Sequence, residues 1–527
     1  MKKQDILQED TQRTKGLDAR ESNIQAAIAL ADILKTTLGP QGLDKMLIDS
    51  MGDSIVTNDG VKILKEMEIE HPGAKILVDV AKTQESQVGD GTTTAVLLAG
   101  ELLKKSKELL AQNIHPNLIA KGYKEVSLKT LTLLNSISQD VKTNNKKLIE
   151  DIAKTAMTGK IAELNMEKLS SILFEITQIL KTENSLSINK LKIQKIPGSL
   201  EESELIQGIV LDKNPAHSNM VKTLKNPNIL LVDFALEIQE IEADAKVNIN
   251  SLQEYEQFIE SEKKYLKNLV LKIKETGANF IVCQKGIDDS VAYFLAKEGI
   301  LASRRTRKSD LEKLSLALNT PIVSSYEDVN KENLGTCVLV QVKEIENEQY
   351  IFVENTPNKQ TLTLLLKAST KHVRDELERA IEDALGDLNS IMKSKKIVAG
   401  GGAIECELVK ELQKELKYLT GKEELIAKAF TESLLIIPKT LCQNSGFDEI
   451  EILSKLQKEH ENGNSNSGIN GFKGIVKDTL KESIIEPINV KEQAILSATE
   501  ATCMILRIDD IIAARKLDKS HEFKGDF

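Results

Sequence analysis

The sequence of 527 residues contains no tryptophan and only seven tyrosines and eleven phenylalanines. Proteins that bind nucleobases or sugars by stacking depend on aromatic side chains, so this shortage argues against such binding surfaces. Basic residues are also in deficit, with 70 Lys plus Arg against 80 Asp plus Glu and a formal net charge of −10. Because sequence-general nucleic-acid binding needs a basic face, we expect no nucleic-acid partner.

Cysteine and histidine are scarce and scattered. The five cysteines lie tens of residues apart, and no Cys or His pair has metal-ligand spacing. This pattern predicts neither a disulfide framework nor a zinc module, and it favours a reducing compartment. No run approaches the roughly 18 apolar residues of a spanning helix, and the N-terminus lacks the apolar core of a signal peptide. We therefore expect a cytoplasmic protein with no membrane partner.

The length and the hydropathy pattern indicate several domains. At roughly 100 to 200 residues per domain, the chain suggests about three. The first 140 residues have the pattern of a mainly helical domain with a small hairpin, formed by short strands at 45–48 and 54–57. The helices that we predict in this part cover 18–34, 74–88, 92–111 and 116–138.

The middle of the chain has a different pattern. Between about 187 and 362, short aliphatic and β-branched runs alternate with helical stretches, which is typical of an α/β domain. Helical periodicity resumes from Lys371 to Met392 and continues after the glycine-rich turn 399–403. Because the two helical ends resemble each other, we expect one folding unit with an α/β insertion. The strands that we predict in the insertion cover 229–232, 279–283, 337–342 and 350–353.

The strongest local signal for a binding site is the run Gly89-Asp90-Gly91-Thr92-Thr93-Thr94, which opens an apolar helix. Free N–H groups at a helix start attract anions, and glycine lets a phosphate approach the backbone. Asp90 would repel this phosphate unless a hard cation bridges them, so Asp90 is a candidate Mg²⁺ ligand. The simpler interpretation is an Asp/Thr helix cap. Neither a P-loop nor a Rossmann motif is present.

Three other segments matter only in combination. Leu38-Gly39-Pro40 forms a second tight turn that suits a phosphate, although helix termination is the simpler explanation. Asp59 lies in Thr57-Asn58-Asp59-Gly60, which we interpret as a hairpin turn that needs no function. Asp383 lies on a helix among small apolar residues, where it is either solvated or points into a site to orient an attacking water.

Together these segments resemble the chaperonin family. Within that family the chain is similar to group II chaperonins, and most of all to the archaeal thermosome subunits. The matching segments occur in the family's order and approximate spacing and extend over nearly the whole chain. They are Thr37-Leu38-Gly39-Pro40, Thr57-Asn58-Asp59-Gly60, Gly89-Asp90-Gly91-Thr92-Thr93, Gly400-Gly401-Gly402-Ala403 and Ile485-Glu486-Pro487.

The resemblance implies a role for each matching position. Asp90 would hold Mg²⁺, and Asp59 and Asp383 would position or activate the hydrolytic water. Lys160 would sense the γ-phosphate, and Glu486 would accept hydrogen bonds from the ribose hydroxyls. The remaining positions expected to bind ATP are Leu38, Gly39, Pro40, Gly91, Thr92, Thr93, Thr94 and Gly401.

The resemblance also implies an α+β multidomain chaperonin fold. A mainly helical equatorial domain would comprise 1–144 and 401–527, and a small intermediate domain would comprise 145–212 and 363–400. The α/β apical domain, 213–362, would carry a helical protrusion. Within that protrusion Tyr255, Phe258 and Ile259 are expected to meet neighbouring subunits or unfolded chains. The stripe from Leu266 to Ile273 is expected to pack on its own domain.

The implied function is that of an ATP-dependent molecular chaperone in a stacked double ring. The subunit would be an ATPase that uses ATP and Mg²⁺ to enclose and fold non-native polypeptides, in a homo- or hetero-oligomer. Two alternatives stay open: an ATPase-silent structural subunit of a ring, and a metabolic ATP-dependent phosphotransferase.

Overall fold

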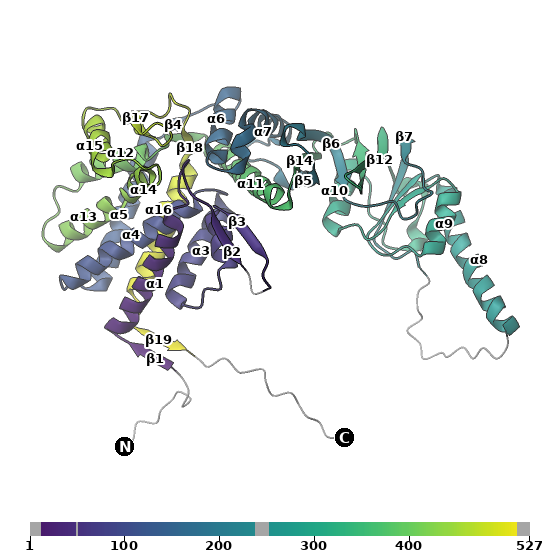
Figure 1. Ribbon diagram of the computed structural model, residues 1–527, viewed down its shortest axis with the longest axis horizontal. Coiled ribbons are helices and arrows are strands. Elements are labelled where there is room, and N and C mark those ends of the chain that lie inside the picture. The colour runs from purple at the N-terminus through teal and green to yellow at the C-terminus, as the bar shows by residue number, and fades with distance from the viewer. Residues whose placement is uncertain (1–11, 49–50, 238–251, 514–527) are drawn as a thin grey trace, which may run out of the picture. The chain divides into compact units, whose positions relative to one another are not determined.

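The computed structural model describes residues 12–48, 51–237 and 252–513 (Figure 1). The chain divides into two compact units, one made of Met1–Met166 and Arg379–Phe527 and the other of Glu167–Glu378. The two ends of the chain therefore belong to one unit, as the predicted insertion requires. The predicted intermediate domain falls across this division, and the three-domain boundaries stay a prediction.

Long helices that pack side by side form the centre of the first unit (Figure 1). Their apolar residues recur at helical spacing and pack in a common core, and residues 94–100 are buried on every side of their helix. Tyr123 and Phe430 meet edge to face in this core, with ring centroids 5.6 Å apart. The central helices are α1 (Leu17–Lys35), α3 (Pro72–Gln87), α4 (Thr92–Ala111), α5 (Pro116–Ile137) and α16 (Ile488–Leu506).

Two of the scattered histidines have a structural role in this unit. His71 and His115 each precede a proline and form the N-cap of α3 and α5, where the ring Nδ1 accepts a backbone N–H. Proline suits the first helical position because its missing N–H would have no partner there. These His-Pro pairs therefore act as helix start signals.

Shorter elements complete the first unit. The strands form three pairs, β1 with β19, β2 with β3 and β16 with β17, and one three-stranded sheet in the order β18-β15-β4. The strands are β1 (Gln12–Lys15), β2 (Lys45–Ile48), β3 (Ser54–Thr57), β4 (Gln139–Asp140), β15 (Lys396–Ala399), β16 (Ser467–Asn470), β17 (Ile475–Asp478), β18 (Ile485–Pro487) and β19 (Asp510–Ala513). The helices are α2 (Gly60–Glu66), α6 (Lys146–Met157), α12 (Ala403–Glu415), α13 (Lys422–Ser433), α14 (Ile436–Asn444) and α15 (Glu449–Glu461).

The second unit is an α/β structure with two sheets. One sheet has the order β10-β9-β8-β11 with a parallel centre, and the other has the order β5-β14-β6-β13-β12-β7. The strands are β5 (Leu191–Pro197), β6 (Glu204–Leu211), β7 (Thr223–Lys225), β8 (Asn228–Val232), β9 (Phe280–Cys283), β10 (Leu301–Ser303), β11 (Leu334–Thr336), β12 (Leu339–Ile345), β13 (Glu348–Glu354) and β14 (Leu362–Ala368). The helices are α7 (Met166–Leu180), α8 (Leu252–Thr276), α9 (Asp289–Lys297) and α10 (Lys308–Leu318).

Helix α8 contains the region predicted as a protrusion. Leu266, Val270 and Ile273 are buried in the core of the second unit, which confirms that this part of the stripe packs on its own domain. The side chains of Tyr255, Phe258 and Ile259 lie outside the described residues, so their predicted role stays a prediction. Among the described residues, none of the helices combines the length and apolarity needed to cross a membrane.

Two local predictions are wrong. Residues 337–338 are not part of the strand predicted at 337–342, because β12 begins at Leu339. Asp59 does not lie in a hairpin turn, since β2 and β3 have already paired before it. It is instead the N-cap of α2, where its carboxylate accepts the N–H groups of Val61 and Lys62 at 3.1 and 3.2 Å. An Asn-Asp-Gly segment suits both a turn and a helix start, so pairing of the strands decided between them.

Candidate functional site

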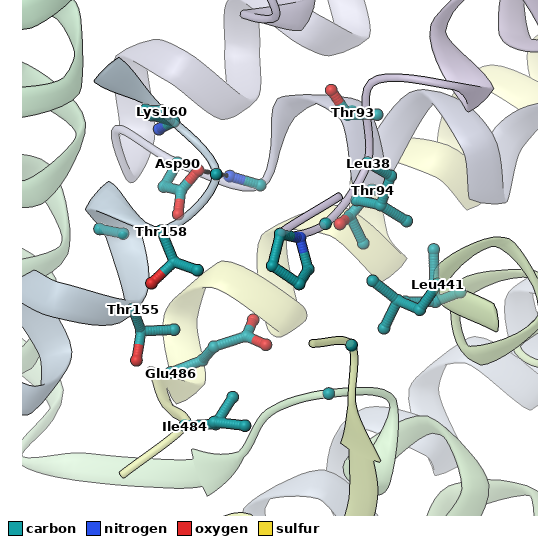
Figure 2. A pocket seen from close by; sticks show the side chains of 18 of the residues that line it. Leu38, Asp90, Thr93, Thr94, Thr155, Thr158, Lys160, Leu441, Ile484 and Glu486 are labelled. Carbon is teal, nitrogen blue, oxygen red and sulfur yellow. Dashed lines mark hydrogen bonds between the residues drawn. The ribbon is translucent and has the colours of Figure 1, made fainter. Parts of the chain in front are cut away.

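The first unit contains a cavity of about 440 Å³. Its wall comes from segments that are hundreds of residues apart in the sequence, and the Glu486 carboxylate points into the space (Figure 2). All thirteen residues that we predicted for a site line this one cavity. They are Leu38, Gly39, Pro40, Asp59, Asp90, Gly91, Thr92, Thr93, Thr94, Lys160, Asp383, Gly401 and Glu486.

The loop after α1 forms one wall. Gly39 has a φ of +89°, which favours glycine, and its carbonyl accepts the Gly42 N–H at 2.9 Å. Asn444 of α14 donates to the carbonyls of Lys35 and Leu38 at 2.9 and 2.7 Å. These hydrogen bonds fix the loop to a helix that is distant in the sequence. The loop therefore does more than end α1, because it also shapes the wall of the cavity.

The start of α4 forms the adjacent wall. Its N-cap is Gly91, which has a φ of +78° and provides no side-chain cap, so the interpretation as an Asp/Thr helix cap is wrong. The Asp90 carboxylate accepts only the N–H of Gly91 in this turn, at 2.7 Å. Gln84 donates to the Asp90 carbonyl at 2.8 Å and so fixes the turn from behind. The first N–H groups of α4 thus open towards the cavity, where an anion would satisfy them.

Three carboxylates and one ammonium group gather at this end. Lys160 Nζ lies 2.5 Å from Asp383 Oδ2, and both side chains are largely buried. Burial, with the charges of Asp90 and Asp59, raises the pKa of Asp383 to about 7 although Lys160 opposes the shift. Burial alone would lower the pKa of Lys160, but Asp383, Asp90 and Asp59 outweigh it and raise that pKa. Lys160 therefore remains a cation among acids.

A fourth carboxyl, which the sequence analysis missed, lies behind this cluster. Asp387 is 2% exposed and follows Asp383 by one turn of α11 (Lys371–Ser394). Burial first, and then Asp90 and Glu486, raise the pKa of Asp387 well above its usual range. The only sequence signal for it was the four-residue spacing from Asp383, which also occurs on solvated acidic helices.

Glycine allows α11 to approach the Asp90 turn closely. A Cβ on Gly386 would lie 2.7 Å from the Gly89 Cα and 2.9 Å from the Val88 carbonyl oxygen. One turn later, Ser390 donates to the same Val88 carbonyl at 3.2 Å. The helix that carries Asp383 is thus packed directly on the turn that carries Asp90.

The opposite end of the cavity is formed by the Gly400–Gly402 turn and the strands beside it. Gly401 has a φ of +66°, its carbonyl accepts the Ile469 N–H at 2.8 Å, and a Cβ there would lie 2.6 Å from the Ile469 oxygen. Strand β16 is held from behind by His460, which is 1% exposed. The two ring nitrogens of His460 lie 2.6 Å from Glu407 Oε2 and 2.8 Å from the Ser467 carbonyl. These contacts fix the wall that contains Ile469.

Lys491 and Glu405 were also missed by the sequence analysis. Lys491 Nζ lies 2.8 Å from Glu486 Oε2 and 2.8 Å from Glu405 Oε1. Burial alone would lower the pKa of Lys491, but Glu405 and Glu486 outweigh it and raise that pKa. Burial raises the pKa of Glu486, and Lys491 opposes that shift. The three residues come from separate elements, so no short motif in the sequence points to them.

The chemistry of this lining suits a ligand that bears phosphate. The uncapped start of α4 and Lys160 offer positive charge, and Asp90 offers the hard oxygen that Mg²⁺ prefers. Mg²⁺ is commonly bound through one or two carboxylates, with substrate phosphates and water as the other ligands. A cleft with one such carboxylate beside an anion site therefore fits a magnesium-complexed phosphate.

Comparisons with known proteins identify the family of the chain. The model of the TCP-1/cpn60 chaperonin family matches residues 30–516. The chain is 47% identical to a thermosome subunit of Pyrococcus horikoshii, over 98% of this chain and 95% of that protein. It is 46% identical to a thermosome subunit of Methanopyrus kandleri over the same shares. It is 44% identical to the thermosome subunit alpha of Archaeoglobus fulgidus, over 99% and 96%.

The chain belongs to the TCP-1/cpn60 chaperonin family. Its similarity to thermosome subunits supports the chaperone function of a group II chaperonin. Neither the phosphotransferase nor the ATPase-silent alternative is favoured.

Proposed function

We propose that this chain is a cytoplasmic ATP-hydrolysing subunit of a stacked double-ring chaperonin that encloses non-native polypeptides. Supporting the ring is the occurrence of subunits named alpha and beta among the thermosome relatives. Supporting a reducing compartment are five cysteines that are all free. The observation that carries the ATPase proposal is the convergence of the uncapped start of α4, Asp90 and the Asp383–Lys160 pair on one cavity.

We assign each group of residues in the cavity a separate role in phosphoryl transfer. Backbone N–H groups from the Leu38–Pro40 loop and the start of α4 would bind the triphosphate, and Asp90 would hold Mg²⁺. The metal, when bound, neutralises charge on the phosphates. Asp59 and Asp383 would orient the attacking water, and Lys160 would stabilise charge on the γ-phosphoryl group. Catalysis by positioning and electrostatics is typical of phosphoryl transfer.

Coupling to chamber closure would follow from α11, which belongs to both units. This helix is continuous from Lys371 to Ser394, and the division between the units falls between Glu378 and Arg379. If only one orientation of α11 brings Asp383 and Lys160 to the γ-phosphate, ATP binds that orientation more tightly and shifts the population towards it. We keep the equatorial, intermediate and apical boundaries as part of this proposal.

Asp383→Asn tests the ATPase assignment. We expect ATP binding to persist and hydrolysis to fall by about 10² to 10⁴-fold, because the amide retains the shape of the side chain without its negative charge. The matched control is Asp375→Asn, which breaks an ion pair with Lys195, also at 2.5 Å, on the same helix outside the cavity. Phosphate release and equilibrium nucleotide binding measure the two effects. Equal turnover in the Asp383 variant and the control would refute the assignment.

A further inference from the structure

Lys491, Glu486 and Glu405 form a cluster of three charged side chains that differ in exposure. Two of them are almost completely buried, and the third is more exposed in the cavity. The side chains of Lys491 and Glu405 are each 6% exposed, whereas that of Glu486 is 21% exposed. Lys491 forms an ion pair with each carboxylate at 2.8 Å. With one ammonium group and two carboxylates, the cluster carries a net charge of −1 when all three groups are ionised. Only Glu486 is well placed to meet a ligand.

The position of Lys491 is not explained by the stability of its helix. It lies in the first turn of α16, where the helix dipole disfavours a cation. Burial of an ion cluster also has a desolvation cost that hydrophobic residues of similar volume avoid. An ammonium group here therefore points to a role in the cavity.

Glu405 holds Lys491 from behind. Apart from the ion pair with Lys491, neither oxygen of Glu405 has a hydrogen-bond partner among the described residues. Its surroundings include Leu98, Leu408 and Ile437, which screen charge poorly. Glu405 thus attracts Lys491 strongly and stabilises its charged form.

Glu486 is consequently left with one oxygen for a ligand. Oε2 is bonded by Lys491, and Oε1 lies over Gly400, where a Cβ would come within 2.9 Å of it. The carboxylate points into the cavity (Figure 2). Fixing one oxygen of a carboxylate determines the direction in which the other accepts.

We propose that Lys491 is a positioning residue that sets the sugar specificity of the site, because it holds Oε2 of Glu486 so that Oε1 accepts from the ribose hydroxyls of the nucleotide. This inference rests on the proposed function, since it requires a nucleotide in the cavity. It predicts that the site distinguishes ribonucleotides from nucleotides without ribose hydroxyls, and that this discrimination depends on Lys491.

A charge-matched double variant, Lys491→Met/Glu405→Gln, tests the proposal. It removes the bond to Glu486 but keeps the net charge of the cluster at −1. The probes are Mg-ATP and Mg-2′,3′-dideoxy-ATP, with dissociation constants measured by calorimetry at fixed pH and salt. We expect the affinity for ATP to fall by about ten- to a hundredfold, as for loss of a hydrogen bond to a charged group. The affinity for the dideoxy nucleotide should stay within about twofold, because it cannot form this bond.

Two reference variants calibrate the experiment. Glu486→Ala removes the acceptor and should abolish the preference for ATP. Glu405→Gln alone leaves the Lys491–Glu486 bond and should keep that preference. If the first double variant does not fold, Lys491→Met/Glu405→Leu provides the same test, because its apolar side chains match the surroundings of Glu405.

Three results would overturn the proposal. They are retention of the full preference for ATP by the double variant, a parallel fall of both affinities as for a structural defect, and loss of the preference in Glu405→Gln alone. Failure of the proposed function is distinguishable, since the wild-type protein would then bind neither nucleotide.

Discussion

Four aspartates in or near the cavity have different partners and burial, although they are the same residue type. They are Asp59, Asp90, Asp383 and Asp387. Asp59 caps a helix, and Asp90 accepts a backbone N–H in a glycine turn. Asp383 is paired with Lys160, and Asp387 is buried. Burial raises the pKa of Asp383 and of Asp387, and the charge of Asp90 adds to both shifts.

The pH profile of ATP hydrolysis tests the state of Asp383. With a pKa of about 7, Asp383 is partly protonated near neutrality. Because only the carboxylate accepts a proton from water, kcat/KM should rise with pH through about 7 and then level off. Lys160 opposes the raised pKa, so Lys160→Met should move the rising limb to higher pH. Steady-state rates across the pH range measure this shift.

Lys195→Met is the matched control for that profile, because Lys195 pairs with Asp375 at the same 2.5 Å distance and does not line the cavity. Its rising limb should remain near that of the wild type. A rate that falls as pH increases, or identical limbs in the two lysine variants, would contradict the assignment of this pKa to Asp383.

At the scale of elements, the site depends on close backbone contacts between segments that are remote in sequence. The Asp90 turn is held by Gln84 and by the approach of Gly386, and the Leu38 loop is held by Asn444. Rigid supports of this kind matter because displacement of a catalytic group by about 1 Å can reduce the rate by roughly 10²-fold.

Gly386→Ala tests the close contact between α11 and the Asp90 turn, because helix propensity and packing predict opposite changes in stability. In an exposed helix the change would stabilise by about 0.5–1 kcal/mol. Here the Cβ would contact the backbone at Gly89 and Val88, and overpacking typically costs about 1–3 kcal/mol. We expect lower stability and at least about tenfold slower hydrolysis, since α11 must move away from the Asp90 turn. Thermal unfolding and turnover measure both effects.

Lys393→Ala, at an exposed position of the same helix, is the control and should leave turnover unchanged. A Gly386→Ala variant that is more stable than the wild type and fully active would show that hydrolysis does not depend on the close contact.

At the scale of the whole molecule, each unit has its own hydrophobic core, but the surface still contains large apolar side chains. Around the β2–β3 hairpin, Leu43, Met46 and Ile48 are 66%, 67% and 69% exposed. Large apolar side chains exposed to this degree make the hairpin a candidate for contact with another protein. It is consistent with the proposed ring, in which neighbouring subunits would cover it.

Gel filtration tests the assembly. We expect the wild-type protein to elute as a particle many times larger than one chain. Met46→Lys/Ile48→Lys should shift the elution towards the single chain, because burial of two ammonium groups in an interface is costly. Nucleotide binding should persist, since neither residue lines the cavity. Elution of the wild type as a monomer or dimer would contradict the double ring.

The sequence by itself determined the four long helices of the N-terminal part, the membership of both chain ends in one folding unit, and the family. Apolar residues at regular spacing and glycine turns are local signals, which explains why 92–111 coincides with α4. The motifs also led to all thirteen candidate site residues, because a family resemblance transfers positions without geometry.

Only the tertiary structure decided the surroundings of individual groups at those positions. The sequence did not distinguish an N-cap from a hairpin turn at Asp59, and its only signal for Asp387 was the spacing from Asp383. It did not indicate that Lys491 lies between Glu486 and Glu405. Charge state, burial and the direction of a hydrogen bond depend on atoms from remote segments. They are set when the chain folds and brings those atoms within a few ångströms of one another.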